Sequence, residues 1–237
     1  MDVQEGHKGA SWLSVLVVGW GYYDSFAVLE RREFHGRIDV TEGEAWKDLT
    51  EWLKTRPTWR DIPITGVGID TGYEPDTVFN AIRDIREKAH SRTLGVRGSS
   101  DIKAPITRRG SRGGGRLGFV YWSGVHKAKD FLINRIAGKA QDGPWPKVWF
   151  SAGLADEVWD ELSSEKRKPV NKGGKMVIMW VNSGGRRNEA LDCLVYSLTI
   201  HRALQPDIMD PEQWDKELER RAAEGAAKQM PSEQGYF

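Results

Sequence analysis

The chain has 237 residues, of which 39% are hydrophobic and 29% are charged, and its net charge is +1. This composition is typical of a water-soluble globular protein of one large or two small domains, and no apolar run is long enough to span a membrane. The single cysteine, Cys193, excludes an internal disulfide and a cysteine-ligated zinc site and fits a reducing, cytoplasmic setting. No secretory signal is expected.

The first elements are two strands and a helix. Residues 12–20 and 26–31 are rich in β-forming side chains, and the short glycine-containing connection between them predicts an antiparallel hairpin. Residues 42–54 place apolar side chains at helical spacing, which predicts an amphipathic helix.

A buried strand at residues 64–70 organises the rest of the chain. It stops at a carboxylate, Asp70, and a helix at 75–89 begins with a proline in its first turn. A further strand at 93–96 predicts a parallel pair with a right-handed crossover. Ligands of open α/β sheets bind at the carboxyl ends of strands, where Asp70 lies. The alternative is that Asp70 only caps the turn.

Residues 97–116 are basic and rich in glycine, with one acid, Asp101, so they predict a loop or a loose hairpin rather than core. Such a segment is either a contact for phosphates or a solvated surface. Its basic residues are Arg97, Lys103, Arg108, Arg109, Arg112 and Arg116.

The remaining elements are shorter, except for one strong helix near the end. We expect strands at 117–122, 148–150 and 176–181, and helices at 127–136, 158–162 and 188–204. Residues 1–205 are therefore predicted to form one domain with the basic loop 97–116 inserted. Residues 206–237 are polar and predict an exposed helix at 212–227 followed by a disordered end.

Three aspartates, Asp2, Asp70 and Asp192, are candidates for catalysis or metal binding. Glu189 lies three residues before Asp192 on the same helix. A carboxylate on the inner side of a helix is costly unless it is paired or binds a metal. Carboxylate oxygens suit Mg²⁺ or Mn²⁺, and two such ions about 3.5–4 Å apart support attack of water on a phosphodiester. The alternative is that Asp192 pairs with Arg186 or Arg187 and that Asp2 is solvated.

Other chemistries are excluded by their missing motifs. The P-loop sequence Gly-x-x-x-x-Gly-Lys-Ser/Thr does not occur, so this chain is not expected to contain a nucleotide-hydrolysing motor. The five histidines have no metal-ligand spacing, and no Ser/His/Asp set is apparent.

Six short motifs occur in order along the chain. They are Asp-Val-Gln at 2–4, Gly-Trp-Gly at 19–21, Ile-Asp-Thr-Gly-Tyr at 69–73, Val-Arg-Gly-Ser-Ser at 96–100, Lys-Ala-Lys-Asp at 127–130, and Arg-Arg-Asn-Glu-Ala-Leu-Asp-Cys at 186–193 with Tyr196. Together they resemble the nuclease region of large terminase subunits from tailed bacteriophages, in the GpA (lambda-like) lineage.

This resemblance implies an RNase H-like α/β fold, with a mixed five-stranded sheet flanked by helices. It implies a DNA endonuclease that uses two Mg²⁺ or Mn²⁺ ions and cuts concatemeric viral DNA in the host cytoplasm. The carried-over catalytic and metal-binding residues are Asp2, Asp70 and Asp192, with Glu189 as a further metal ligand. The residues expected to bind DNA phosphates are Arg97, Lys103, Arg108, Arg109, Arg112, Lys127, Lys129, Arg186 and Arg187.

The implied partners are double-stranded DNA and, in the full protein, an ATPase domain, the small terminase subunit and the portal. No membrane is expected, and assembly into an oligomer stays open. Family members carry the ATPase domain ahead of this region. The chain is therefore expected to be an excised nuclease portion with a shortened first strand and a mobile Asp2. Two alternatives stay open: a resolvase- or transposase-like enzyme of the same fold, and a non-catalytic DNA-binding or assembly module.

Overall fold

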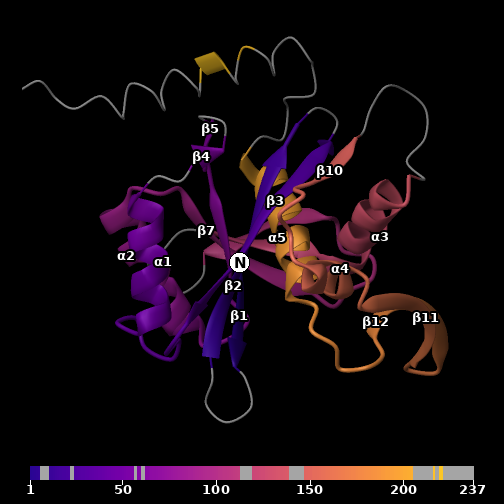
Figure 1. The fold of residues 1–237 in the computed structure, drawn as a ribbon. Helices are drawn as coiled ribbons and strands as arrows, with labels where there is room; N and C mark the ends of the chain where they lie inside the picture. Colours follow the sequence, from indigo (N-terminus) through magenta and orange to yellow (C-terminus); the bar gives the residue numbers. More distant parts are fainter. Residues whose placement is uncertain are drawn as a thin grey trace, which may run out of the picture.

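A computed structural model gives the fold of the chain (Figure 1). The residues it describes are 1–5, 11–21, 24–55, 58–59, 62–112, 119–138, 147–204, 216 and 219–220. Within these ranges, no helix combines the length and the apolar character that crossing a membrane requires. The predicted helix at 212–227 and the predicted disordered end lie almost wholly outside the described residues.

The first sheet contains the N-terminal hairpin. Its strand order is β1-β2-β3-β10, formed by Asp2–Glu5, Ser11–Trp20, Phe26–His35 and Val148–Phe150. β2 is antiparallel to both β1 and β3, which confirms the predicted hairpin, and β10 joins β3 in parallel.

The second sheet has the order β6-β7-β9-β8, formed by Val67–Asp70, Thr93–Ser99, Phe119–Gly124 and Thr107–Arg112. β6, β7 and β9 are mutually parallel, which confirms the parallel pair predicted around the helix that follows Asp70. β8 is the antiparallel edge strand and carries a register shift against β9.

The prediction of one five-stranded sheet is wrong, because the described residues form two four-stranded sheets and two separate hairpins. The polar strand β8 and the short strand β10 each extend a sheet. The edge strands β1 and β6 are bridged through the backbone of Met1, which donates to the Gly68 carbonyl at 2.9 Å and accepts the Asp70 N–H at 3.1 Å. The hairpins are β4–β5 (Thr58–Trp59 and Ile62–Pro63) and β11–β12 (Glu165–Lys172 and Lys175–Asn182).

Helices cover both faces of the sheets. α1 and α2 lie together on one side of the molecule, α3 and α4 lie on the other, and α5 runs behind the strands (Figure 1). These helices are Glu44–Lys54, Pro75–Ala89, Val125–Ile136, Asp156–Leu162 and Glu189–Leu204. All five were predicted from periodicity, and the boundaries differ by at most two residues. The coarse α/β class is therefore confirmed.

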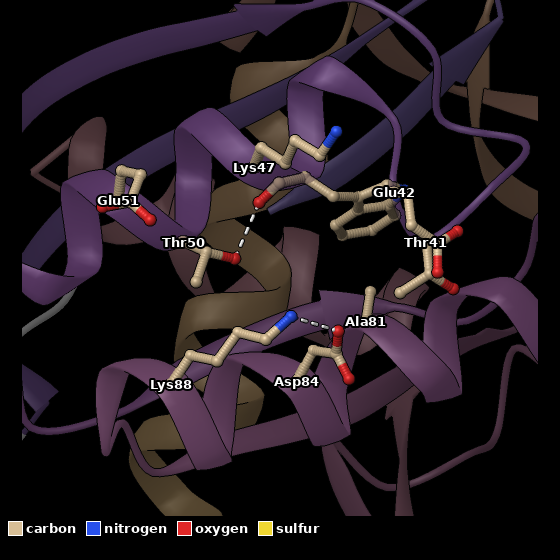
Figure 2. Close-up of a pocket in the computed structure, with 9 residues that line it drawn as sticks. Thr41, Glu42, Lys47, Thr50, Glu51, Ala81, Asp84 and Lys88 are labelled. Carbon is tan, nitrogen blue, oxygen red and sulfur yellow. Dashed lines mark hydrogen bonds and ion pairs between the residues drawn. The ribbon is translucent and has the colours of Figure 1, made fainter.

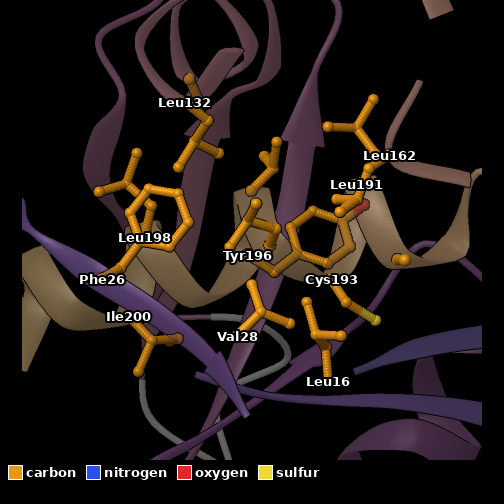
Figure 3. Close-up of a cluster of buried hydrophobic side chains, with 14 of the residues drawn as sticks. Leu16, Phe26, Val28, Leu132, Leu162, Leu191, Cys193, Tyr196, Leu198 and Ile200 are labelled. Atoms are coloured by element: carbon orange, nitrogen blue, oxygen red, sulfur yellow. The ribbon is translucent and has the colours of Figure 1, made fainter. Parts of the chain in front are cut away.

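Strand β2 shows how the sequence divides the core into two clusters. Its alternating side chains send Leu13 and Val15 into a cluster with α1 and α2, and send Leu16 into a cluster around α5. In that second cluster, Leu198 of α5 lies beside Phe26 of β3, and Leu191, at the other end of the cluster, lies beside Leu162 (Figure 3). α5 is apolar on almost every side because it is buried between neighbours, as helices without a polar face usually are.

Residues 97–116, predicted as a loop or a loose hairpin, are more regular than expected in the part that the structure describes. β7 continues through Arg97 to Ser99, and residues 107–112 form β8. Residues 113–116 lie outside the described part. β8 pairs as a strand despite its charge because it is at the sheet edge, where exposed basic side chains are tolerated.

Candidate active site

The three candidate aspartates come from three elements that meet. Asp2 is the first residue of β1, Asp70 is the last residue of β6, and Asp192 lies in the first turn of α5. The Met1 bridge brings β1 beside β6, and α5 packs against both strands. The fold therefore gathers residues from the start, first third and last fifth of the chain.

Asp2 is buried, with 5% of its surface exposed. Its Oδ1 accepts the Val3 N–H at 3.0 Å and its Oδ2 accepts the Gln4 amide at 2.5 Å. Burial, then repulsion from Asp192 and Asp70, raises the pKa of Asp2 to about 7. The alternative of a solvated Asp2 is thus wrong, and Asp2 sits in a paired strand opposite Ser14.

Asp70 is partly buried at the end of its strand and turns toward the chain that follows. Its Oδ1 accepts the Gly72 N–H at 3.1 Å, so it does cap the turn. Burial raises its pKa, and the Asp192 charge adds to this effect, while the Gly72 hydrogen bond opposes it. Asp70 can therefore cap the turn and still be available for catalysis or metal binding, because its Oδ2 does not take part in the hydrogen bond with Gly72.

Asp192 is held by a buried lysine. Lys129 on α3 is 3% exposed, and its Nζ lies 2.8 Å from Asp192 Oδ1 and 2.6 Å from Glu165 Oε1. The Asn188 amide donates to Asp192 Oδ2 at 2.8 Å and to Glu165 Oε1 at 2.9 Å. Burial raises the pKa of Asp192, and the Lys129 ammonium opposes that rise.

Two predictions about these side chains are corrected by this network. Asp192 pairs with Lys129, not with Arg186 or Arg187. Lys129, expected to contact DNA phosphates, is instead enclosed between two carboxylates. Sequence spacing alone could not distinguish an inward-facing from an outward-facing lysine on the amphipathic helix α3.

Arg187 and Glu189 belong to a second charged network. Arg187 forms ion pairs with Glu33, with Glu161 at 3.4 Å and with Glu189 at 3.1 Å. Glu161 also accepts the Ala190 N–H at 2.8 Å and so caps the start of α5. Glu189 is thereby engaged by Arg187 beside the aspartates, and Arg187 has acidic neighbours that compete with phosphates.

The other residues predicted to bind DNA are at the surface. Arg97 is exposed and its guanidinium lies 5.7 Å from the Trp122 ring centroid. The exposed Lys127 donates to the Lys103 carbonyl at 2.8 Å. Lys103, Arg108, Arg109 and Arg186 are also exposed, and the Arg112 side chain lies outside the described part.

The pKa of the buried Tyr196 is affected by all three aspartates. The Tyr196 pKa is raised well above its usual range by burial, followed by the charges of Asp70, Asp192 and Asp2. Its hydroxyl group therefore lies within electrostatic reach of each of them. The sequence placed Tyr196 in the last motif, without assigning it to the site.

The donor set fits a hard divalent cation in chemistry, since three carboxylates from different elements repel one another there. In the described part of the chain, however, no three His, Cys, Asp or Glu side chains converge closely enough to hold a metal ion as they stand. Lys129 supplies positive charge to Asp192 in this arrangement. Metal binding would require the carboxylates to approach one another.

Two residues of this site were missed by sequence reasoning. Asn188 is four residues before Asp192, and this helical spacing is a usable signal for a hydrogen-bonded pair. Glu165 carries no such signal, because its role depends on a long-range meeting of β11 with α3.

A shallow pocket elsewhere does not overlap this site. Figure 2 shows it between α1 and α2, where Lys88 pairs with Asp84 at 2.7 Å and the Thr50 hydroxyl donates to the Trp46 carbonyl at 2.7 Å. None of the three aspartates lines it.

The chain is similar to a known protein family over most of its length. The sequence model of a family described as terminase large subunit gpA, endonuclease domain, matches residues 1–214. The terminase large subunit of Escherichia phage lambda is 28% identical to this chain over 199 residues, which cover 78% of this chain and 30% of the relative. The chain thus spans less than a third of the length of that relative. No solved structure matches.

Proposed function

This chain belongs to the gpA endonuclease-domain family of terminase large subunits, and on that premise we propose that it is a metal-dependent DNA endonuclease. Its substrate is concatemeric viral DNA in the host cytoplasm, and its reaction is hydrolysis of phosphodiester bonds during genome packaging. In the whole protein, an ATPase domain, the small terminase subunit and the portal complete the packaging assembly.

The observation that carries the proposal is the mutual repulsion of Asp2, Asp70 and Asp192. A carboxylate whose pKa is raised to about 7, first by burial and then by two further carboxylates, is costly to keep for packing alone. Such perturbed groups concentrate at functional sites. A divalent cation would remove the repulsion and would give these three acids a reason to lie together.

The strand arrangement supports an RNase H-like organisation of this site. β3, β2 and β1 are followed across the Met1 bridge by β6 and β7. Met1 bonds to two residues that are two positions apart on β6, which is the pattern of parallel neighbours. Asp2 and Asp70 thus lie on adjacent parallel strands, where both can face one substrate.

In this proposal Asp2, Asp70 and Asp192 hold two Mg²⁺ or Mn²⁺ ions, with Glu189 beside them. The bound ions would supply Lewis acidity and orient the reacting oxygens for in-line displacement at phosphorus. Lys129 and Asn188 fix the Asp192 side chain. Arg97, Arg108, Arg109 and Lys127 contact backbone phosphates, so cleavage has little base readout of its own.

The test is cleavage of supercoiled plasmid with Mn²⁺ or Mg²⁺. Wild type should nick and linearise the plasmid, and Asp70→Asn should abolish this while retaining an acceptor for the Gly72 N–H. Asp48→Asn, an equal change on the exposed side of α1, should cleave like wild type. A wild-type protein that leaves DNA intact with both metals contradicts the proposal.

The Lys129–Asp192 ion pair favours a second candidate, a non-catalytic DNA-binding or assembly module, because it neutralises one acid without a metal. Such a module would bind DNA equally well with and without EDTA and would gain no thermal stability from Mn²⁺. Cleavage of a branched DNA junction compared with cleavage of linear duplex would identify a resolvase-like enzyme, because such an enzyme should prefer the junction.

A further inference from the structure

We propose that the β11–β12 hairpin binds the phosphate backbone of duplex DNA through one basic face and presents the duplex to the aspartates. The proposal rests on the nuclease function proposed above and adds a DNA-binding surface to it. The basic face is defined as Lys166, Lys168, Lys172 and Lys175, none of which is among the basic residues singled out from the sequence.

The pairing register puts these four lysines on one face. Side chains alternate along a strand, and directly opposite residues share a face. Lys166, Lys168 and Lys172 are separated by even numbers of positions on β11, and Lys172 is opposite Lys175 on β12. All four are exposed.

The other face of the hairpin is turned toward the body of the protein at its base. It carries Arg167, which pairs with Asp130 of α3 at 3.4 Å, and Trp180, whose indole donates to Asp130 at 2.9 Å. Toward the tip it carries Met176 and Ile178, which are 66% and 59% exposed. The lysines therefore point away from the contact with α3.

The basic face has no internal neutralisation. Among the described residues, no carboxylate forms an ion pair with any of its four lysines, and Lys172 instead donates to the Ser100 carbonyl at 3.4 Å. Lys172 and Lys175 are like charges in directly opposite positions, an arrangement that weakens a hairpin in isolation. A polyanion would relieve this repulsion, and a row of lysines suits a phosphate backbone.

Both ends of the hairpin connect to the site. β11 begins at Glu165, which forms an ion pair with Lys129, the partner of Asp192. β12 ends at Asn182, whose amide donates to the Arg186 carbonyl at 2.6 Å, just before α5. Figure 1 shows the hairpin projecting from this end of α5, beyond α4. A duplex lying along the basic face would thus lead toward Asp192.

The hairpin also extends the basic surface predicted from the sequence. The Lys172 contact with Ser100 joins its tip to the segment after β7. In that segment, the Lys103 carbonyl accepts a hydrogen bond from Lys127. The hairpin lysines, Lys103 and Lys127 are therefore linked by contacts into one region.

The experiment changes all four lysines of the basic face to glutamine and measures binding to a fluorescent 30-base-pair duplex by anisotropy in EDTA, where no cleavage occurs. The matched control removes four exposed charges from α1 and α2 by changing Lys47, Lys54, Arg83 and Lys88 to glutamine. Circular dichroism melting verifies that both variants are folded.

The hairpin variant should bind at least tenfold more weakly than the control at about 0.1 M salt. Its slope of log affinity against log salt should be smaller by about 3–4 if all four lysines contact phosphates, since each contact contributes about 0.9. Equal affinities and slopes for the two variants would overturn the proposal. Binding of polyglutamate is measured alongside. If the hairpin variant loses polyglutamate binding but still binds the duplex like the control, the proposal is also overturned, because the face would then suit an acidic protein.

Cleavage by wild type in Mn²⁺ is measured separately, so that the two proposals can fail independently. Weakened duplex binding by the hairpin variant, together with no cleavage by wild type, supports the hairpin proposal and contradicts the nuclease. Active wild type, with the hairpin variant binding like the control, contradicts the hairpin proposal alone.

Discussion

Lys129 Nζ lies 2.8 Å from Asp192 Oδ1, inside a group of aspartates that otherwise repel one another. The same ammonium group lies 2.6 Å from Glu165, so one buried cation serves two carboxylates. Removing one partner of a buried ion pair leaves the other charged and unpaired, which costs more than the pair itself contributes.

Lys129→Met should therefore lower the free energy of unfolding by about 3–5 kcal/mol, measured by urea denaturation. Lys127→Met, two residues away on the exposed side of α3, should change it by less than about 1 kcal/mol. The double change Lys129→Met with Asp192→Asn should cost less than the sum of the single changes, because one of the two carboxylates that lose their partner is then neutral. Additive losses would contradict a direct interaction.

Asp2→Asn should stabilise the metal-free protein at pH 8. The folded-state pKa of Asp2, about 7, is above its unfolded value, so ionisation of Asp2 removes stability as the pH rises from about 4 through 7. Asparagine avoids that charge and keeps an acceptor for the Val3 N–H. A higher melting temperature than wild type at pH 8, with little difference at pH 4, is expected, with Asp48→Asn as the unchanged control.

Mn²⁺ should raise the melting temperature of wild type and not that of Asp192→Ala. A ligand at a hundred times its dissociation constant adds about 2.7 kcal/mol, which corresponds to roughly 5–10 °C for a domain of this size. Differential scanning fluorimetry with Mn²⁺ and with EDTA measures the difference. An equal rise in both proteins would place the metal away from Asp192.

Asp24 provides a pH-dependent contribution remote from the aspartate site. Burial acts to raise its pKa, but hydrogen bonds and charge from His201 and Arg202 outweigh burial and hold the pKa at about 2. Because this pKa is below the unfolded value, the stability it contributes is present above about pH 4 and is lost as the pH falls through 2.

Asp24→Asn should accordingly cost about 2 kcal/mol near pH 6 and almost nothing near pH 2, as followed by urea denaturation across that range. Asp39→Asn, which removes an exposed partner of Arg37, is the comparison and should show no such trend. A loss independent of pH would mean that Asp24 contributes through packing rather than through its charge.

The fold was predictable where side-chain periodicity is strong. α2 was expected at its observed residues, and the β2–β3 hairpin and the β6–β7 parallel pair were expected from apolar runs and their connections. β8 and β11 were missed because they are polar edge strands, whose formation depends on a partner's backbone rather than on their own side chains. The number of strands in each sheet was wrong for the same reason.

The candidate site was predictable only in its acids. Asp70 and Asp192 were identified by their positions at a strand end and on a helix that must pack inward. The orientation of Lys129 was not, since Lys127 and Lys129 lie only two residues apart on α3 and the sequence does not say which of them faces the core. The hairpin lysines were not singled out because their strand had no predicted partner.

α5 contacts strands of both sheets and also carries Asp192. The helix that fixes the two sheets relative to each other is thus the same one that sets the position of a candidate catalytic acid. Substitutions at its buried residues, such as Leu194 or Leu198, should shift the acid as well as loosen the core. The projecting hairpin is free of this double constraint, so its residues can change with less effect on the core than those of that helix.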